Sequence, residues 1–233
     1  SCCSTKNKSD AVAAEPAKAV FTPTSVTTPK TITFPSSDGI AITADLYMAY
    51  PDSAPLILLC HRANWSRGEY LEIAPKLNLQ GFNAIAIDQR SGKTKNNVDN
   101  ATAAAAKAAG KPTQFVDAEQ DIQAAIDYVK ANYAKGTFIL WGSSYSSSLA
   151  LVLTKANEGK IDAVLAFSPG EYFADQGKSS SWITTEAQGV KVPAFLTSKN
   201  SSVKYILFVG VYFNINISSD ILDDKLLAII SFL

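Results

Sequence analysis

A serine-containing segment at residues 142–146, Gly-Ser-Ser-Tyr-Ser, could supply a nucleophile. It lies between an apolar run that ends at Trp141 and a segment of helical character from about Tyr145 to Ala156, so we expect a tight turn from a strand into a helix. Such a turn projects a side chain above the carboxyl edge of a sheet, and the helix N-terminus directs backbone NH groups toward a developing oxyanion. We therefore predict Ser144 as a nucleophile for attack on an acyl carbon.

The residues on either side of this serine are small. Gly142 and Ser146 flank it, and larger side chains would obstruct the cramped backbone that the turn requires. Ser146 takes the place of the second glycine that is usual in this kind of motif. Short strings of this type also arise by chance and by helix capping, so Ser143 or Ser144 could instead cap the helix. The position of the string at a strand-to-helix junction favours the nucleophile.

Strands and helices alternate along the chain around this turn. Alternating residues on both sides of Asp38-Gly39 predict a hairpin, and short apolar runs predict strands buried on both faces. The pattern predicts an α/β fold with a mostly parallel sheet, helices on both faces and the hairpin as an antiparallel edge. The expected strands are Thr31–Phe34, Ala41–Ala49, Leu56–Cys60, Asn83–Asp88, Phe138–Trp141, Ala163–Phe167 and Pro193–Thr197. The expected helices are Tyr70–Leu77, 115–134 and 145–156, and residues 91–114 should form a loop or short helix outside the sheet.

Composition excludes several classes of protein. The 233 residues hold 21 basic and 21 acidic side chains, so no basic field favours nucleic acid. No apolar run approaches the ~20 residues of a membrane-spanning helix. Three cysteines cannot all pair, so disulfides are not the scaffold. His61 is the single histidine, which excludes mechanisms with two imidazoles and a zinc site built mainly on histidine.

The first 30 residues mix Ser, Thr, Lys, Ala and Pro without apolar periodicity, and this predicts a disordered tether. Because the sequence begins at Ser1 and not at Met, we expect residues upstream. A cysteine after a small residue and before a polar tether resembles the start of a bacterial lipoprotein after removal of its signal peptide. Cys2 would then carry a lipid anchor, and the protein would be exported to the cell envelope. Alternatively, Cys2 and Cys3 are incidental cysteines on a disordered end.

The order of elements and motifs resembles the α/β-hydrolase superfamily. The resemblance covers residues 31–198 and rests on the hairpin, the strand at 56–60, the His-Arg-Ala loop at 61–63, the segment NAIAIDQRSG at 83–92, and WGSSYS at 141–146. Within the superfamily, the chain is most similar to dienelactone-hydrolase-like and related esterase or acyl-peptidase branches. The resemblance implies an α/β-hydrolase fold, a small-molecule acyl substrate and no cofactor.

The resemblance also implies roles for the loop after the strand at 56–60. The backbone NH groups of Ala63 and Tyr145 would together hold the oxyanion. Arg62 departs from the glycine of the family in this loop. Dienelactone hydrolases proper use a cysteine nucleophile, whereas Ser144 stands here, which favours ester, lactone or amide substrates.

Several polar and aromatic residues admit two interpretations. His61 could act as the catalytic base, because its strand neighbours the nucleophile strand, or it could support the oxyanion loop, as the resemblance implies. Asp88 could be an acid, but we expect it, like Arg90, to fix the loop after its strand. Trp141 and Tyr172 are expected to pack or to line the cleft rather than to stack on a cofactor. The acids of the long helix are expected on its exposed face: Asp117, Asp121 and Asp127.

The hydrolase pattern breaks toward the C-terminus. The family order is Ser, then Asp or Glu, then His, but no histidine follows His61 and no carboxylate stands near Lys199 or Asn200. Ala, Thr and Pro make up 58 of the first 200 residues but one of the last 33. This shift near Ser201 favours translation of a reading frame other than the native one, which would leave the fold incomplete. The alternative is a divergent C-terminus with a strand or hairpin at 203–217 and a helix at 221–233.

The sequence therefore predicts three segments: a tether at 1–30, an α/β-hydrolase domain at 31–200 and an aberrant tail at 201–233. The predicted function is that of a serine hydrolase acting on carboxylic ester, lactone or related acyl bonds, impaired because the catalytic histidine is absent. The alternative is a non-catalytic binding or scaffold protein with a hydrolase fold. A nucleotide-binding fold is disfavoured, because no glycine-rich loop follows the first strands. No metal is expected.

Overall fold

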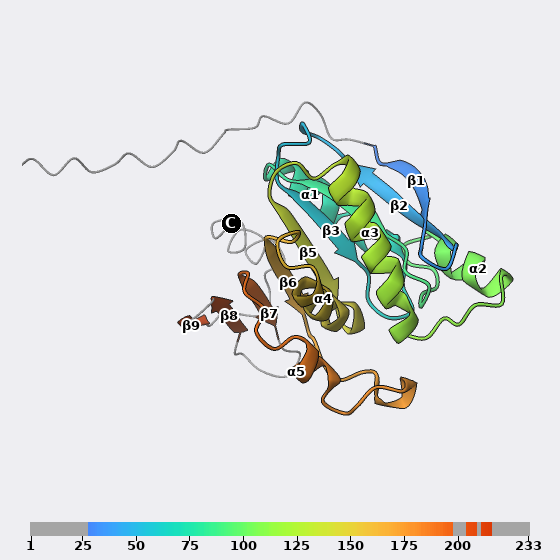
Figure 1. The fold of residues 1–233 in the computed structure, drawn as a ribbon. Helices are drawn as coiled ribbons and strands as arrows, with labels where there is room; N and C mark the ends of the chain where they lie inside the picture. The colour runs from blue at the N-terminus through green and yellow to red at the C-terminus, as the bar shows by residue number, and fades with distance from the viewer. Residues whose placement is uncertain (1–27, 198–203, 209–210, 216–233) are drawn as a thin grey trace, which may run out of the picture.

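The computed structural model describes residues 28–197, 204–208 and 211–215, and their strands form one sheet (Figure 1). The order of strands across the sheet is β1-β2-β4-β3-β5-β6-β7-β8-β9. The strands are β1 (Lys30–Pro35), β2 (Ala41–Tyr47), β3 (Leu56–Cys60), β4 (Asn83–Ile87), β5 (Phe138–Ser143), β6 (Ala163–Phe167), β7 (Ala194–Thr197), β8 (Lys204–Phe208) and β9 (Val211–Ile215).

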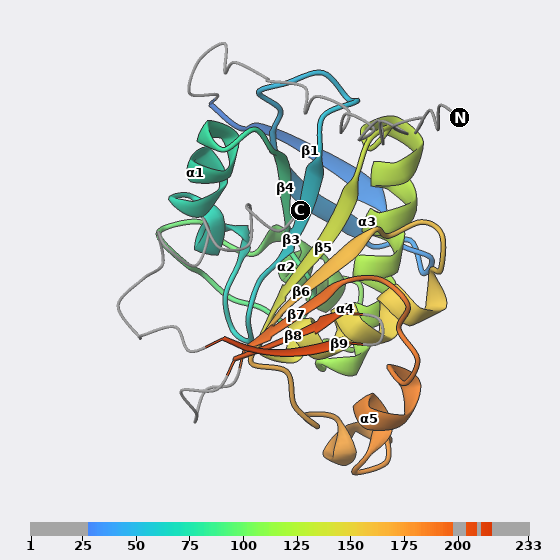
Figure 2. The same ribbon diagram turned by 90° about the vertical axis from the view of Figure 1, so that its left-hand side faces the viewer.

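Helices connect most of these strands. The α-helices are α1 (Ile73–Leu79), α2 (Ala101–Ala108), α3 (Glu119–Asn132), α4 (Tyr145–Ala156) and α5 (Trp182–Glu186), and the 3₁₀ turns are η1 (Arg67–Tyr70), η2 (Val116–Ala118) and η3 (Ala174–Gln176). Figure 2 shows α1 on one side of the sheet and α3 with α4 on the other. Among the residues that the structure describes, no helix is long and apolar enough to cross a membrane.

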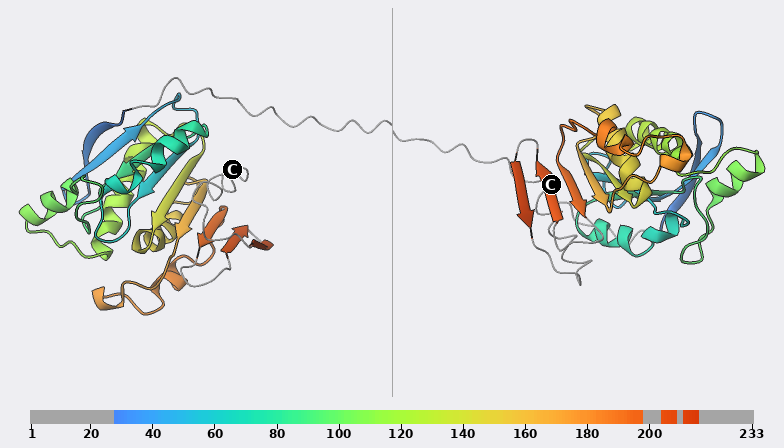
Figure 3. Two further views of the ribbon diagram at one scale, coloured as in Figure 1. Left: turned by 180° about the vertical axis from the view of Figure 1, so that it is seen from behind. Right: turned by 90° about the horizontal axis from the view of Figure 1, so that it is seen from below.

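The centre of the sheet is parallel and both of its edges are antiparallel. Strands β4, β3, β5, β6 and β7 run parallel, and Leu58 of β3 pairs with Ile85 on one side and Leu140 on the other. The β1–β2 hairpin forms one edge, and β8 and β9 continue the sheet antiparallel beyond β7 (Figure 3). Because parallel strands share their direction, the loops after β3, β4, β5 and β6 gather at one edge of the sheet, which is where this fold class builds its sites.

The sheet separates two hydrophobic cores. Strand β3 is buried along its whole length, with Leu56, Leu58 and Cys60 in the core under α3 and α4. Its alternate residues Ile57 and Leu59 lie in the core under α1. Burial on both faces explains why this strand is a continuous apolar run and not an alternating one.

The predicted elements are confirmed, with small shifts in their ends. The predicted hairpin turns at Gly39, which adopts a φ of 84° that favours glycine. The helix expected at 115–134 comprises η2 and α3, and the one expected at Tyr70–Leu77 comprises η1 and α1. In the stretch 91–114, a short helix forms because Asn100 caps it: its side chain accepts a hydrogen bond from the Ala103 NH at 2.7 Å.

The expectation for Asp121 is wrong. This carboxylate is buried and not on an exposed helix face, and it pairs with Arg90 at 2.7 Å. Arg90 is itself 1% exposed and also pairs with Asp38 in the hairpin turn, at 2.9 Å. A buried guanidinium needs counter-charges, and Asp121 supplies one from α3. Asp127 is exposed, as expected, and pairs with Lys160 at 2.8 Å.

The two ends of the chain are only partly described. Strands β8 and β9 lie within the predicted tail and form an antiparallel hairpin there, as the divergent-terminus alternative has it. The predicted helix at 221–233, the predicted lipid anchor at Cys2 and most of the tether lie outside the described residues.

Candidate active site

Ser144 lies at the turn between β5 and α4, with a backbone that L-amino acids rarely adopt. Its φ is 58° and its ψ is −125°, and its NH donates a hydrogen bond to the Phe167 carbonyl at 2.8 Å. Although Ser144 occupies the N-cap position of α4, its side chain makes no capping hydrogen bond. The capping alternative is therefore wrong for Ser144, and its half-buried hydroxyl is not used by the helix. A strained backbone that presents a side chain in this way is a feature of functional sites.

The small residues beside Ser144 allow this turn to form. A Cβ atom on Gly142 would lie 2.4 Å from the Ser146 carbonyl oxygen and 2.4 Å from the Ser147 Cα, both of them backbone atoms. The Ser146 hydroxyl accepts a hydrogen bond from the Ser143 NH at 2.8 Å and lies 2.9 Å from the Cys60 carbonyl oxygen, to which it can donate. The serine that replaces a second glycine thus ties the turn to the end of β3.

The loop after β3 brings the other predicted oxyanion donor to the same edge of the sheet. In the part of the chain that the structure describes, neither the Ala63 NH nor the Tyr145 NH has a hydrogen-bond acceptor. Asn64 follows at a φ of 61°, and its NH donates to the Ser91 carbonyl at 3.4 Å. Two unpaired NH groups on adjacent parallel strand ends are what an oxyanion site requires.

The His61 side chain is fully buried and both of its ring nitrogens have partners. The Nδ1 atom lies 2.8 Å from the Arg62 carbonyl oxygen, and Nε2 accepts a hydrogen bond from the Gln89 NH at 3.0 Å. Because a carbonyl only accepts and a backbone NH only donates, the proton is on Nδ1. Burial lowers the pKa of His61 to about 4, so the ring is neutral. An imidazole bonded in this way supports the loop and has no nitrogen free to take a proton from Ser144.

Gln89 connects the histidine loop to the serine turn. Its Oε1 accepts a hydrogen bond from the His61 NH at 3.0 Å, and its Nε2 donates to the His61 carbonyl and to the Tyr145 hydroxyl, both at 3.2 Å. The Ser91 hydroxyl donates to the same Tyr145 hydroxyl. The tyrosine ring is buried and stacks on Phe115, with 4.7 Å between ring centroids. Gln89 thereby fixes the two segments that carry the predicted oxyanion donors.

Glu69 is a second titratable group at this edge, and no motif in the sequence indicates it. Its carboxylate accepts a hydrogen bond from the Arg62 NH at 2.8 Å, and it also interacts with the Ser143 hydroxyl. Burial raises the pKa of Glu69 to about 7, against the smaller opposing effects of Arg62 and Lys95. The carboxyl group therefore titrates near neutral pH, beside the residue that precedes Ser144.

The remaining predicted residues have structural roles. Asp88 accepts hydrogen bonds from the Arg67 NH and the Ala101 NH, both at 2.8 Å, which fixes the loop after β4. Trp141 is buried and stacks on Phe167 with 4.5 Å between centroids, and the Tyr172 hydroxyl donates to the Ser168 carbonyl. Within the described residues, no group of three or more His, Cys, Asp or Glu side chains could hold a metal ion.

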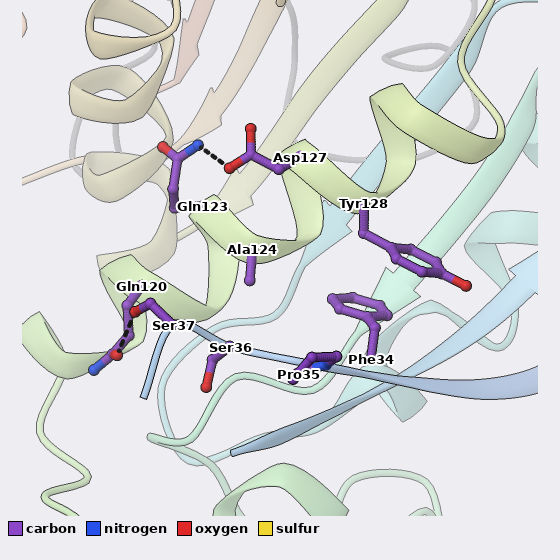
Figure 4. Close-up of a pocket in the computed structure, with 9 residues that line it drawn as sticks. All are labelled: Phe34, Pro35, Ser36, Ser37, Gln120, Gln123, Ala124, Asp127 and Tyr128. Carbon is purple, nitrogen blue, oxygen red and sulfur yellow. Dashed lines mark hydrogen bonds between the residues drawn. The ribbon is translucent and has the colours of Figure 1, made fainter. Parts of the chain in front are cut away.

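A groove of about 410 Å³ lies elsewhere, between β1 and α3 (Figure 4). Phe34 and Tyr128 stack at one end of it, with 4.3 Å between ring centroids. No predicted site residue lines this groove, and we assign it no part in the chemistry of Ser144.

A parallel sheet with a strained serine between β5 and α4 defines an α/β hydrolase. Comparison with known proteins agrees, because the family model described as serine aminopeptidase, S33, matches residues 51–204. The chain belongs to this family. No curated protein matches the chain.

Solved structures with a similar fold include two esterases. The Pyrococcus furiosus esterase Pf2001 superposes with a TM-score of 0.52 at 18% identity, over 72% of this chain and 69% of that one. A highly thermostable carboxyl esterase from Bacillus coagulans superposes with a TM-score of 0.51 at 16% identity, over 64% of this chain and 48% of that one. At these identities, the similarity shows the fold.

Proposed function

We propose that the domain is a serine hydrolase that acts on carboxylic ester, lactone or related acyl bonds. Ser144 attacks the acyl carbon, and the NH groups of Ala63 and Tyr145 stabilise the oxyanion. Membership of a serine hydrolase family and the esterases of the same fold support this class of reaction. The dienelactone-hydrolase-like branch stays a prediction within it.

The observation that carries the proposal is the conformation of Ser144. A positive φ of 58° costs free energy, and the hydroxyl makes no capping bond that would offset it. Gly142 admits no side chain, since the backbone of the following helix lies against it. These features support a local structure that presents the half-buried Ser144 hydroxyl at a helix N-terminus.

We also propose that catalysis by this sequence is impaired. The single histidine, His61, is bonded at both ring nitrogens, and without a base Ser144 keeps its proton. An enzyme that lacks one member of its triad retains only the rate supplied by the oxyanion hole and by binding, roughly 10³–10⁴ above that of water.

The test is hydrolysis of p-nitrophenyl acetate by the full chain, compared with Ser144→Ala. The matched control is Ser148→Ala, a buried serine of the same helix whose hydroxyl donates to the Gly170 carbonyl at 2.8 Å. Without imidazole we expect slow hydrolysis that differs little among the three proteins, because the oxyanion hole and binding supply it. Free imidazole should increase the rate of the wild type and of Ser148→Ala, but not that of Ser144→Ala. Equal rates in all three proteins, with and without imidazole, would contradict the proposal.

A second candidate is a non-catalytic binding or scaffold protein with a hydrolase fold. The observation that favours it is again that both ring nitrogens of His61 have hydrogen-bond partners. A site without a free imidazole can keep its shape but has no base. This candidate would be favoured if the folded protein showed no Ser144-dependent hydrolysis of the ester, with or without imidazole.

The tail and the N-terminus need separate experiments. The family match ends at residue 204, close to the change of composition at Ser201, which supports the proposal that the tail is translated from another frame. Genomic DNA across codons 195–235 tests it. The proposal would be contradicted if the frame is intact and no alternative frame encodes a C-terminus with a histidine.

Export and lipidation at Cys2 remain predictions, which mass spectrometry of the membrane fraction can test.

A further inference from the structure

The loop after β3 carries an arginine where the resembled family has glycine, and this arginine lies on an indole ring. The Cζ atom of the exposed Arg62 is 4.6 Å from the ring centroid of Trp65. A second cation lies over the same ring, because the Lys95 Nζ is 3.8 Å from its centroid. Contact with an aromatic face restrains a cation without neutralising it. Two positive charges are thus held at the Trp65 ring, and one of them belongs to the residue directly before Ala63, which carries a predicted oxyanion NH.

The backbone of Lys95 is fixed against η1. Its NH donates to the Val98 carbonyl at 3.0 Å, which closes a tight turn. The Asn96 side chain donates to the Gly68 carbonyl at 2.9 Å, and a Cβ on Gly68 would lie 2.1 Å from the Lys95 carbonyl oxygen. The backbone of this turn, packed against η1, therefore helps to position the Lys95 side chain at the Trp65 indole.

The charges of the other arginines are matched, and that of Arg62 is not. Arg67 pairs with Asp45 at 3.0 Å and with Asp88 at 2.7 Å. Arg90 pairs in the same way with two carboxylates. Within the described residues, neither Arg62 nor Lys95 forms an ion pair with a carboxylate.

The acid Glu69 lies close to these two cations. Glu69 interacts with both Arg62 and Lys95, but burial raises its pKa to about 7, so it carries only part of a negative charge at neutral pH. Glu69 therefore offsets only part of the positive charge of Arg62 and Lys95, and the remaining charge on these two side chains attracts an anionic group in a ligand.

We propose that Arg62 and Lys95 form an anion subsite beside the oxyanion loop, which selects acyl substrates that carry a carboxylate, such as half-esters of dicarboxylic acids. This inference rests on the proposed function for its location next to the reacting bond. A guanidinium that lies on an indole keeps its in-plane NH groups available for a carboxylate. Lys95 adds a second positive charge from the loop between β4 and α2.

Binding of two probes to the full chain tests the subsite. Monomethyl succinate carries an ester and a carboxylate, whereas dimethyl succinate carries two esters and no charge. Tryptophan fluorescence reports binding, because Trp65 contacts both cations. We expect the half-ester to bind roughly tenfold more tightly, with a preference that declines as salt is added. Equal affinities for the two probes would overturn the proposal.

Variants assign the preference to these residues. The double variant Arg62→Gln, Lys95→Gln should bind both probes equally, whereas Lys107→Gln, an exposed lysine on α2, should keep the wild-type preference. Circular dichroism checks the fold of each variant. Should the double variant unfold, Arg62→Gln and Lys95→Gln alone should each lower the preference by roughly threefold, and an unchanged preference in both would overturn the proposal.

The binding experiment is independent of turnover. Ser144→Ala should retain the preference for the half-ester, since the subsite does not use the hydroxyl. If the preference is present but no hydrolysis depends on Ser144, the proposed function fails and the subsite stands. If hydrolysis depends on Ser144 but both probes bind equally, the subsite alone fails.

Discussion

The turn at Ser144 and the loop at His61 follow the neighbouring parallel strands β5 and β3, but the polar side chains of the two segments differ in their hydrogen bonding. Ser144 has a strained backbone and a hydroxyl that the helix does not use. His61 has an ordinary role in a buried network and no ring nitrogen to spare. The backbone of Ser144 thus has the conformation that the proposed nucleophile requires, whereas the imidazole of His61 is bonded within its own loop and to Gln89.

The largest effect is expected from a side chain at Gly142. The variant Gly142→Val places carbon atoms where the backbone of Ser146 and Ser147 lies, and we expect a loss of about 3 kcal/mol or more in the free energy of unfolding. Gly39→Ala is the control, because Gly39 has a φ of 84° but nothing within 4 Å of its Cβ position. It should cost about 1 kcal/mol from backbone strain alone. Similar losses in the two variants, measured by urea denaturation, would show that the turn is not tightly packed.

Titration of His61 tests whether its imidazole is buried and neutral. Burial lowers its folded pKa to about 4 from an ordinary 6.5, so the unfolded chain binds the proton first as the pH falls. The free energy of unfolding should lose up to about 3 kcal/mol from this residue between pH 6.5 and pH 4, and nothing from it above pH 6.5. Because the chain has one histidine, its NMR signal is unambiguous. A midpoint near 6.5 would mean an accessible imidazole and would break the contrast with Ser144.

Glu69 has the opposite dependence on pH. Its folded pKa is raised to about 7, so the folded state favours the neutral carboxyl, and stability from this residue is lost as the pH rises from 4.5 through 7. Glu69→Gln should therefore be more stable than the wild type by roughly 2 kcal/mol at pH 8 and little changed at pH 4. Thermal unfolding at the two pH values measures this. A variant that is less stable at pH 8 would show that the carboxylate is stabilised in its charged form by Arg62 and Lys95.

The smallest effect concerns the strain at Ser144 itself. Ser144→Gly should raise the free energy of unfolding by about 1 kcal/mol, because glycine adopts a φ of 58° without steric cost. Ser144→Ala should be nearly neutral, since it retains the Cβ atom. If the free energies of unfolding of the glycine and alanine variants are equal, the backbone of Ser144 is not strained.

The sequence predicts the sheet well because its central strands are continuous apolar runs and its helices have a regular period. It also predicts the serine turn, whose signal is local: a glycine, a serine and small neighbours at the end of a strand. The sequence does not indicate the pairing of Asp121 with Arg90, because a buried carboxylate on a helix has the same spacing as an exposed one. A signal for it is the polar run Asp-Gln-Arg-Ser-Gly that follows β4 directly.

The network around His61 depends on contacts between distant segments. Gln89 meets His61 and Tyr145 only after β3, β4 and β5 pair, and nothing in their spacing along the chain indicates it. Glu69 and Lys95 are likewise brought to the Arg62 loop by η1 and by the turn that follows β4. Sequence patterns show which segments fold, whereas the polar groups of the site are defined by how those segments pack.

The most direct test of Ser144 as the nucleophile is covalent labelling of the full chain with a fluorophosphonate, followed by intact mass and peptide mapping. We expect one adduct, formed slowly, on Ser144, absent in Ser144→Ala and retained in Ser148→Ala. The absence of any adduct in the folded wild type, or an adduct that persists in Ser144→Ala, would contradict it.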